Sequence, residues 1–199
     1  MSISARESIL GSIRRHLFES AEQPALDGPW IQYADPVAQF ATVLAAIGGR
    51  CVRVQNVDEI NQDLATFPAY AQARTQVSLV PGVGRSDLDF EGLADPHGLS
   101  NIDLAILPGE FGVAENAAVW VTDAVVKHRV IYFLSHHLAL VIPAATIVHH
   151  MHEAYGRLKF ETPRFGVFIA GPSKTADIEQ SLVIGAHGPK SMTVYVMGS

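Results

Sequence analysis

The segment richest in groups that can do chemistry runs from Gly171 to Glu179 and reads GPSKTADIE. An apolar run typical of a strand, Gly166–Ala170, leads into it. Ser173, Lys174 and Thr175 supply two hydroxyl groups and one ammonium group, all of them donors to an anion. The phosphate-binding pattern G-x-x-x-x-G-K-[ST] is absent, so this segment is not a P-loop.

We predict that this segment leaves a strand through a Gly-Pro turn and enters a short helix near Thr175–Ser181. In one interpretation the free amides of the helix start bind an anion, at the carboxyl ends of the strands where ligands collect in α/β sheets. In the other, Ser173 or Thr175 caps the helix, and Asp177 and Glu179 counter its dipole. The sequence leaves both interpretations open.

Two glutamates, Glu110 and Glu115, bracket a glycine-bearing turn that follows the apolar run Leu104–Leu107. A carboxylate held at the end of a strand can act as a general base or as a nucleophile. The alternative is that both are solvated loop carboxylates. These two residues are the catalytic candidates.

Histidine is concentrated in one part of the chain, because six of the nine histidines lie between positions 128 and 152. We predict a helix over about Ala145–Leu158, on which His149 with His152 or Glu153 has the spacing that chelates zinc. The H-E-x-x-H pattern is absent, and a zinc site would need a further ligand from another segment, for which His136 and His137 are the candidates. We therefore expect no metal site, and a polar helix face or an oligomer contact instead.

The predicted elements indicate an α/β fold with a mainly parallel sheet flanked by helices. Capping patterns place helix starts at Ser4 with Glu7, at Asp35 before Pro36, and at Asn56 with Glu59. The closely spaced runs after Glu110 leave no room for crossover helices, which predicts some antiparallel strands in the C-terminal half. The predicted strands are Cys51–Val54, Val77–Val80, Leu104–Leu107, Ala117–Val121, Val130–Leu134, Ala139–Ile142, Gly166–Ala170, Leu182–Ile184 and Thr193–Met197.

We divide the chain into an N-terminal helix with a linker, residues 1–28, and a single α/β domain, residues 29–199. Ile9, Ile13 and Leu17 form one apolar stripe on the first helix. That stripe can pack on the domain or on another subunit, and it is compatible with a homo-oligomer.

Composition excludes several classes of protein. The 199 residues are 48% hydrophobic and 17% charged, which is a globular rather than a disordered balance. The formal net charge of −6 disfavours nucleic-acid binding. The single cysteine, Cys51, cannot form an internal disulfide or ligate a four-thiolate iron–sulfur cluster. Without a secretion signal or an 18-residue apolar stretch, we expect a cytoplasmic protein with no membrane contact.

The GPSKTADIE segment and the following Leu182–Lys190, LVIGAHGPK, together resemble the C-terminal signature of the lactate-utilisation (LUD) family, in its LutC-like form. Gly112–Asn116, GVAEN, is similar to the family segment G-[IV]-A-E-[TS]. Asn116 stands where the family usually has Thr or Ser, which removes a hydroxyl from that position. The resemblance covers about Glu110 to Val196.

The resemblance implies a fold similar to the NagB/RpiA/CoA-transferase class and a role in bacterial L-lactate oxidation. It also implies partner subunits, one of which carries iron–sulfur clusters, so we expect no cofactor in this chain. His187 lies in the family-like motif, where it either reaches the ligand or bonds a backbone carbonyl. The ligand-binding candidates are Ser173, Lys174, Thr175, Asp177, Glu179, Asn116 and His187.

Three functions stay open at this point. The first is a LutC-like subunit of lactate utilisation that binds a small anionic or phosphate-bearing ligand. The second is a scaffold subunit with no chemistry of its own, which contacts partners through its N-terminal helix and its histidine-bearing helix. The third is a CoA or acyl transferase that uses Glu110 or Glu115 as the nucleophile.

Overall fold

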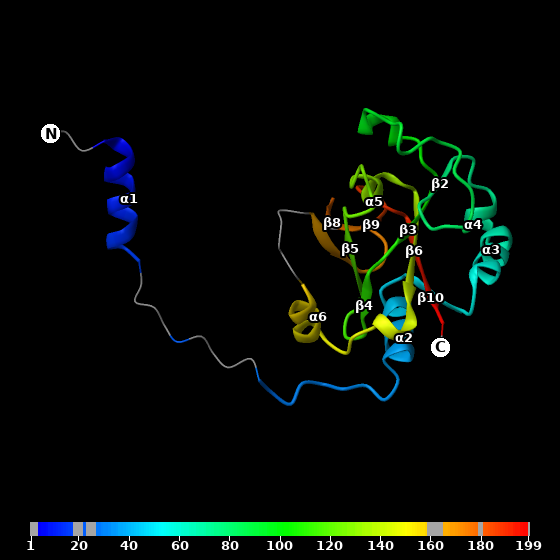
Figure 1. Ribbon diagram of the computed structural model, residues 1–199, viewed down its shortest axis with the longest axis horizontal. Helices are drawn as coiled ribbons and strands as arrows, with labels where there is room; N and C mark the ends of the chain where they lie inside the picture. Colours follow the sequence, from blue (N-terminus) through cyan, green and yellow to red (C-terminus); the bar gives the residue numbers. More distant parts are fainter. Residues whose placement is uncertain (1–3, 18–21, 23–26, 159–164, 179–180, 199) are drawn as a thin grey trace.

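The computed structural model describes residues 4–17, 22, 27–158, 165–178 and 181–198. Its centre is a five-stranded parallel sheet with strand order β1-β10-β6-β3-β2 (Figure 1). Because all five strands are parallel, their amino ends share one edge of the sheet and their carboxyl ends share the opposite edge. These strands are β1 (Arg50–Val54), β10 (Ser191–Met197), β6 (His137–Pro143), β3 (Leu104–Pro108) and β2 (Gln76–Ser78).

The helices that flank this sheet begin at the predicted caps. Asp35 accepts a hydrogen bond from the Ala38 amide at the start of α2 (Pro36–Ala46). Asn56 accepts one from the Glu59 amide at the start of α3 (Val57–Thr66). A short helix, α4 (Pro68–Ala71), follows directly. The local signals for α2 and α3 are therefore confirmed.

Strand β10 shows how the sheet buries both of its faces. Val194 points into the core that α2 supplies with Phe40 and Leu44. Its neighbour Tyr195 points the other way, into the core that includes Ile60 of α3. Alternate side chains of one strand thus serve two separate cores, as the two-residue period of a strand requires.

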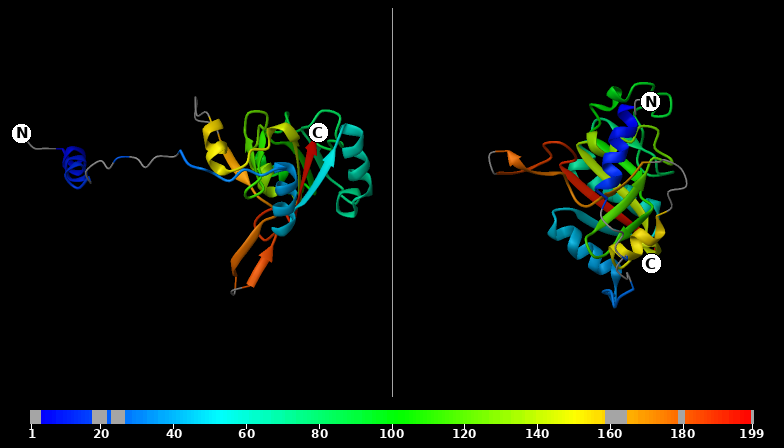
Figure 2. Two further views of the ribbon diagram at one scale, coloured as in Figure 1. Left: turned by 90° about the horizontal axis from the view of Figure 1, so that it is seen from below. Right: turned by 90° about the vertical axis from the view of Figure 1, so that its left-hand side faces the viewer.

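A second sheet is antiparallel and consists of β4 (Phe111–Val113), β5 (Ala118–Thr122) and β7 (Gly166–Ile169). A separate hairpin, β8 (Lys174–Ile178) with β9 (Ser181–Ile184), projects from the body (Figure 2). The predicted fold class, a mainly parallel α/β sheet with antiparallel strands in the C-terminal half, is confirmed.

Two predicted elements are wrong. Val130–Leu134, predicted as a strand, contains the short helix α5 (Ile131–Leu134). The helix predicted over Ala145–Leu158 is shorter: α6 covers Met151–Arg157 and follows the single 3₁₀ turn η2 (Ala144–Thr146). Short apolar runs do not distinguish strand from helix. Residues before α6 pair with β4 instead, where the Val148 amide donates to the Gly112 carbonyl over 2.9 Å.

The helix predicted near Thr175–Ser181 is also wrong. This part of the chain forms the β8–β9 hairpin, in which Thr175 pairs with Val183. The Leu-Val-Ile run of β9 offers a partner strand, and pairing with it replaces the local capping pattern that suggested a helix. Glu179 lies outside the described residues.

The first helix, α1 (Ala5–Arg15), has the predicted capping box between Ser4 and Glu7. It lies apart from the sheets in Figures 1 and 2. The stripe of Ile9, Ile13 and Leu17 is exposed, with 61%, 54% and 69% of the three residues accessible, respectively.

A short 3₁₀ turn, η1 (Pro96–Leu99), precedes β3. Within the described part of the chain, no helix is long and apolar enough to span a membrane.

Candidate functional site

The two halves of the motif described above meet in space. The Ser173 amide donates to the Pro189 carbonyl over 2.9 Å, and the Gly185 amide donates to the Ser173 carbonyl over 3.0 Å. A Cβ on Gly188 would lie 2.8 Å from the Ser173 Cβ, so only glycine allows this close approach. We call the loops 171–174 and 185–190 together the motif junction.

The motif junction lies at the amino edge of the parallel sheet. Pro189 lies two residues before the start of β10, and the Lys174 ammonium donates to the carbonyl of Ile47, which ends α2 just before β1. The expectation that this loop lies at the carboxyl ends of the strands is therefore wrong. A cation at the last carbonyls of a helix stabilises it, so Lys174 has a structural partner.

From the motif junction the chain enters β10 beside two histidines. The Lys190 amide donates to the His136 carbonyl over 2.7 Å. The next residue, Ser191, has its Oγ 2.7 Å from Nδ1 of His137, the first residue of β6. His187 is exposed in the same loop. The junction thus continues into a histidine-bearing surface.

His137 lines a cavity of about 290 Å³ between α4 and the amino ends of β3 and β6. We call it the amino-edge cavity; its lining residues are Ala69, Gln72, Ala73, Arg74, Asp103 and His137. Burial lowers the pKa of His137, and the neighbouring His136 and Lys190 lower it further, against an opposing effect of Asp103. The His137 ring is therefore neutral near pH 7.

Asp103 is the one acidic residue in that lining, and its charge is largely engaged. Its Oδ2 accepts hydrogen bonds from the amides of Arg74 and Thr75, over 2.8 and 3.2 Å. Its Oδ1 lies 3.4 Å from Nδ1 of His136. Burial would raise the pKa of Asp103, but these two amides and His136 hold it below its ordinary value.

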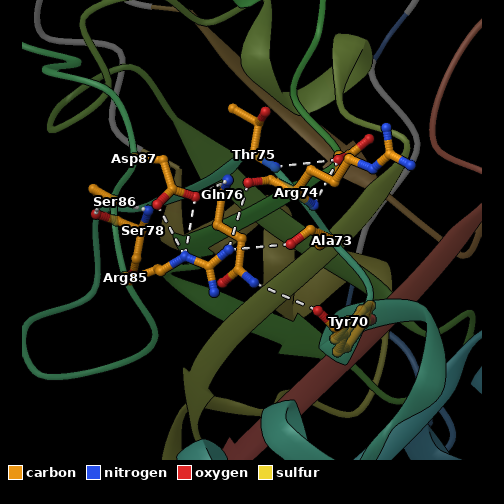
Figure 3. A network of polar contacts seen from close by, with 10 residues as sticks. Tyr70, Ala73, Arg74, Thr75, Gln76, Ser78, Arg85, Ser86 and Asp87 are labelled. Atoms are coloured by element: carbon orange, nitrogen blue, oxygen red, sulfur yellow. Dashed lines mark hydrogen bonds and ion pairs between the residues drawn. The ribbon is translucent and has the colours of Figure 1, made fainter.

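A network of polar contacts holds the wall of the cavity that carries Arg74 (Figure 3). The Arg85 guanidinium reaches between the Asp87 carboxylate, 2.9 Å away, and the Ala73 carbonyl, 3.1 Å away. Asp87 also accepts from the Gln76 amide over 2.9 Å. The backbone on either side of Arg74 is therefore fixed.

The sequence analysis missed a set of buried and half-buried polar groups, which begins at Tyr70, whose ring centroid is 6.0 Å from that of His137. The Tyr70 hydroxyl donates to Thr193 Oγ1 over 2.6 Å, and burial raises the pKa of Tyr70. Arg50, Asp63 and Tyr195 form a second group, in which the Tyr195 hydroxyl donates to Asp63 Oδ2 over 2.6 Å. The Arg50 hydrogen bonds lower the pKa of Asp63.

The two glutamates lie on the β4–β5 hairpin, at opposite ends of β4. Glu110 is exposed, and its Oε1 accepts from the Thr122 hydroxyl over 2.6 Å. Glu115 lies in the turn, where its Oε2 accepts from the Met151 amide over 2.9 Å. Among the described residues, neither makes a hydrogen bond or ion pair with the motif junction.

Glu115 and Asn116 line a second cavity of about 290 Å³ against α6, and we call it the Glu115 cavity. His152 lines it as well, with its ring edge-on to Trp30 at a centroid distance of 3.8 Å. Asn116 Oδ1 is engaged in its own turn, where it accepts from the Ala118 amide over 3.0 Å. Most of the wall is apolar or histidine: Trp30, Ile31, His150 and Met151.

The histidine pair on which the zinc spacing depended is not on one helix. His149 precedes α6, and its Nδ1 accepts from the Tyr33 amide over 2.9 Å. Glu153 accepts from the His149 amide over 2.7 Å, so its carboxylate serves the helix start. No three His, Cys, Asp or Glu side chains in the described segments are grouped so that they could hold a metal ion.

Three other candidates, Thr175, Asp177 and Glu179, belong to the β8–β9 segment, and the structure describes only part of it. Thr175 is a half-buried residue of β8 and pairs with Val183. Asp177 lies in the same strand, and its side chain is outside what the structure describes, as is Glu179. The structure therefore brings Ser173, Lys174 and His187 together at the motif junction. It places Glu115, Asn116 and His152 elsewhere, in the Glu115 cavity.

The sequence of the chain matches the LUD domain family over residues 97–197, and the chain belongs to this family. Curated relatives are the proteins named lactate utilization protein C. That of Geobacillus kaustophilus is 29% identical over 123 residues, 59% of this chain and 48% of the relative. That of Anoxybacillus flavithermus is 37% identical over 86 residues, 43% of this chain and 39% of the relative. The chain thus spans about half the length of the curated relatives it matches or less.

A solved structure supports the fold. A DUF162 family protein from Deinococcus radiodurans superposes with a TM-score of 0.63, over 84% of this chain and 99% of that chain. The two sequences are 16% identical, so this likeness concerns the fold alone.

Proposed function

We propose that this protein serves in bacterial L-lactate utilisation as a LutC-like subunit that binds a small anion at the motif junction. The observation that carries the proposal is the similarity of its C-terminal half to several proteins named lactate utilization protein C. The family-like segments are the ones that form the junction, since Ser173 bonds Pro189 directly.

The charges around the junction support an anionic ligand. The ammonium groups of Lys174 and Lys190 flank it. Lys174 already donates to Ile47, so its contribution to the ligand is mainly its positive charge. The hydroxyl of Ser173 supplies a neutral donor, and the imidazole of His187 lies exposed in the facing loop.

The role is tested by complementation. The chain is expressed in a bacterium that has a lactate utilization protein C of its own, such as Geobacillus kaustophilus, after deletion of that gene. We expect growth on L-lactate as sole carbon source to return with the unaltered chain. Lys190→Gln should restore it poorly, while the matched control Lys127→Gln, a lysine outside the junction, should restore it fully. No growth with the unaltered, expressed chain would contradict the proposed role.

The exposed stripe of α1 favours a second function, that of a subunit which docks on partners. Three large apolar side chains on one helix face remain accessible in the described structure. The partner implied by the family resemblance is a protein with iron–sulfur clusters. Removal of residues 1–28 should weaken assembly and leave the domain folded; an unchanged assembly mass would contradict this docking function.

A further inference from the structure

We propose that the amino-edge cavity binds a small monocarboxylate, with the carboxylate group held between Arg74 and His137. Both residues line the cavity between α4 and the amino ends of β3 and β6. Neither belongs to the motif segments; the sequence analysis did not single out Arg74, and it considered His137 only as a further metal ligand. The cavity continues the surface of the motif junction, because Lys190 and Ser191 directly join the two.

The balance of charge in the cavity favours an anion. Arg74 supplies a permanent positive charge, and in the described structure its guanidinium makes no hydrogen bond to other protein groups. Lys190 adds a second charge close enough to lower the pKa of His137. Asp103 opposes them, and the charge of Arg74 acts on its carboxylate together with two backbone amides and His136. Arg74 and Lys190 against Asp103 leave one net positive charge around the cavity.

The His137 ring and the backbone that carries Arg74 are fixed before binding. The backbone of Arg74 is anchored on Asp103, and its neighbour Ala73 is anchored on Arg85. The His137 ring is held by its contact with Ser191 Oγ over 2.7 Å. When Ser191 donates to Nδ1, the ring proton is on Nε2, which makes that nitrogen a donor. Fixed donors reduce the entropy lost on binding.

Size and charge select a monocarboxylate over larger or more highly charged anions. The volume of about 290 Å³ is at the lower end of the range typical of small-molecule sites. Because Asp103 lies in the same lining, one net positive charge remains, which a single carboxylate neutralises and a dianion such as phosphate exceeds. The amide of Gln72 can bond a hydroxyl or keto group next to the carboxylate.

This inference deepens the proposed function, and it rests on the part of that proposal that places an anion at the amino edge. Growth on lactate and binding in the cavity are separate measurements. A chain that binds L-lactate through Arg74 but fails in complementation would refute the role and keep the site. A chain that complements but does not bind in the cavity would refute the site and keep the role.

The test uses the full chain and L-lactate as the probe, with binding followed by calorimetric titration at constant ionic strength. Acetate and inorganic phosphate are compared under the same conditions. Arg74→Gln should weaken L-lactate binding about tenfold or more, because a hydrogen bond to a charged group is lost. Arg74→Lys should recover part of the affinity. Arg14→Gln, the same change on α1, is the matched control and should bind as the unaltered chain does.

Three results would overturn the proposal. The first is no L-lactate or acetate binding by the unaltered, folded chain. The second is an equal affinity in Arg74→Gln and in the control. The third is tighter binding of phosphate than of either carboxylate. Arg74 is an exposed residue, so its variants should fold, and circular dichroism confirms that they do.

Discussion

The polar group of Arg50, Asp63 and Tyr195 depends on the Asp63 carboxylate, and replacing Asp63 with asparagine should destabilise the whole domain. Asp63 accepts both Arg50 Nη groups and the Tyr195 hydroxyl. Its side chain is 18% exposed and that of Arg50 is 34% exposed. An asparagine at this position would present an NH2 group to one of these donors, which leaves a donor facing a donor.

The size of the effect follows from the number of hydrogen bonds to the carboxylate. Hydrogen bonds to a charged group contribute roughly 1.5–3 kcal/mol, and exposure of Arg50 reduces that contribution through solvent screening. The substitution removes one of the three hydrogen bonds and takes the charge away from the other two, so we expect stability to fall by about 2 kcal/mol. For a chain of this length, that change lowers the melting temperature by about 4–8 °C.

The effect should depend on pH in a definite direction. The pKa of Asp63 is lower in the folded protein than in the unfolded chain, where it is ordinary. The stabilisation is therefore fully present above the unfolded pKa, near 3.9, and is lost as the pH falls through the folded pKa. The difference between the unaltered protein and Asp63→Asn should be largest at pH 7 and shrink toward acid.

Urea unfolding at several pH values measures this difference. Asp35→Asn is the matched control, because Asp35 pairs with Arg53 while both side chains are 54% exposed. Asparagine is as good a helix cap as aspartate, so the cap on α2 is kept and the change in stability should be much smaller than for Asp63→Asn. Equal unfolding free energies for Asp63→Asn and the control, or a gap that widens in acid, would refute the reasoning.

Two further changes test the packing and the position of Lys174. Gly166→Ala places a Cβ 2.2 Å from the buried Trp120 ring and should lower the free energy of unfolding by about 1–3 kcal/mol. Its control is Gly156→Ala in α6, which should be neutral or stabilising because nothing lies within 4 Å of a Cβ there. Thermal unfolding of both variants measures the difference. Lys174→Met should lower the free energy of unfolding by about 0.3–1 kcal/mol, because the positive charge at the end of α2 is removed. An unchanged free energy of unfolding would show that the contact with Ile47 contributes nothing.

Local signals in the sequence predicted the fold well where a few adjacent residues decide the structure. The caps at Ser4, Asp35 and Asn56 are correct because each side chain bonds an amide three residues away. Antiparallel pairing in the C-terminal half is confirmed, but it joins β5 to β4 and β7, whereas the run Ala139–Ile142 belongs to the parallel strand β6. The α/β class followed from the alternation of such elements.

The errors lie where distant pairing decides. Thr175 is in a strand because Val183 pairs with it, and the residues before α6 extend along β4. The loop after β7 reaches the amino edge because β7 belongs to the antiparallel sheet, and the rule for parallel strands does not apply to it.

The amino-edge cavity was not predictable from spacing. Arg74, Asp103 and His137 are 29 and 34 residues apart along the chain, and only the parallel register of β2, β3 and β6 brings them together. The sequence shows His136 and His137 as neighbours before an apolar run. The contact of His137 with Ser191, however, depends on the pairing of β6 with β10.

The central claim is that the amino edge of the sheet, rather than the Glu115 cavity, binds the small anion. Two-dimensional ¹H–¹⁵N NMR of the assigned protein, titrated with L-lactate, tests it most directly. The account predicts that the largest changes in amide shift occur at Arg74, His137 and Ser191. Largest changes at Glu115, Asn116 and His152, with none at the amino edge, would contradict it.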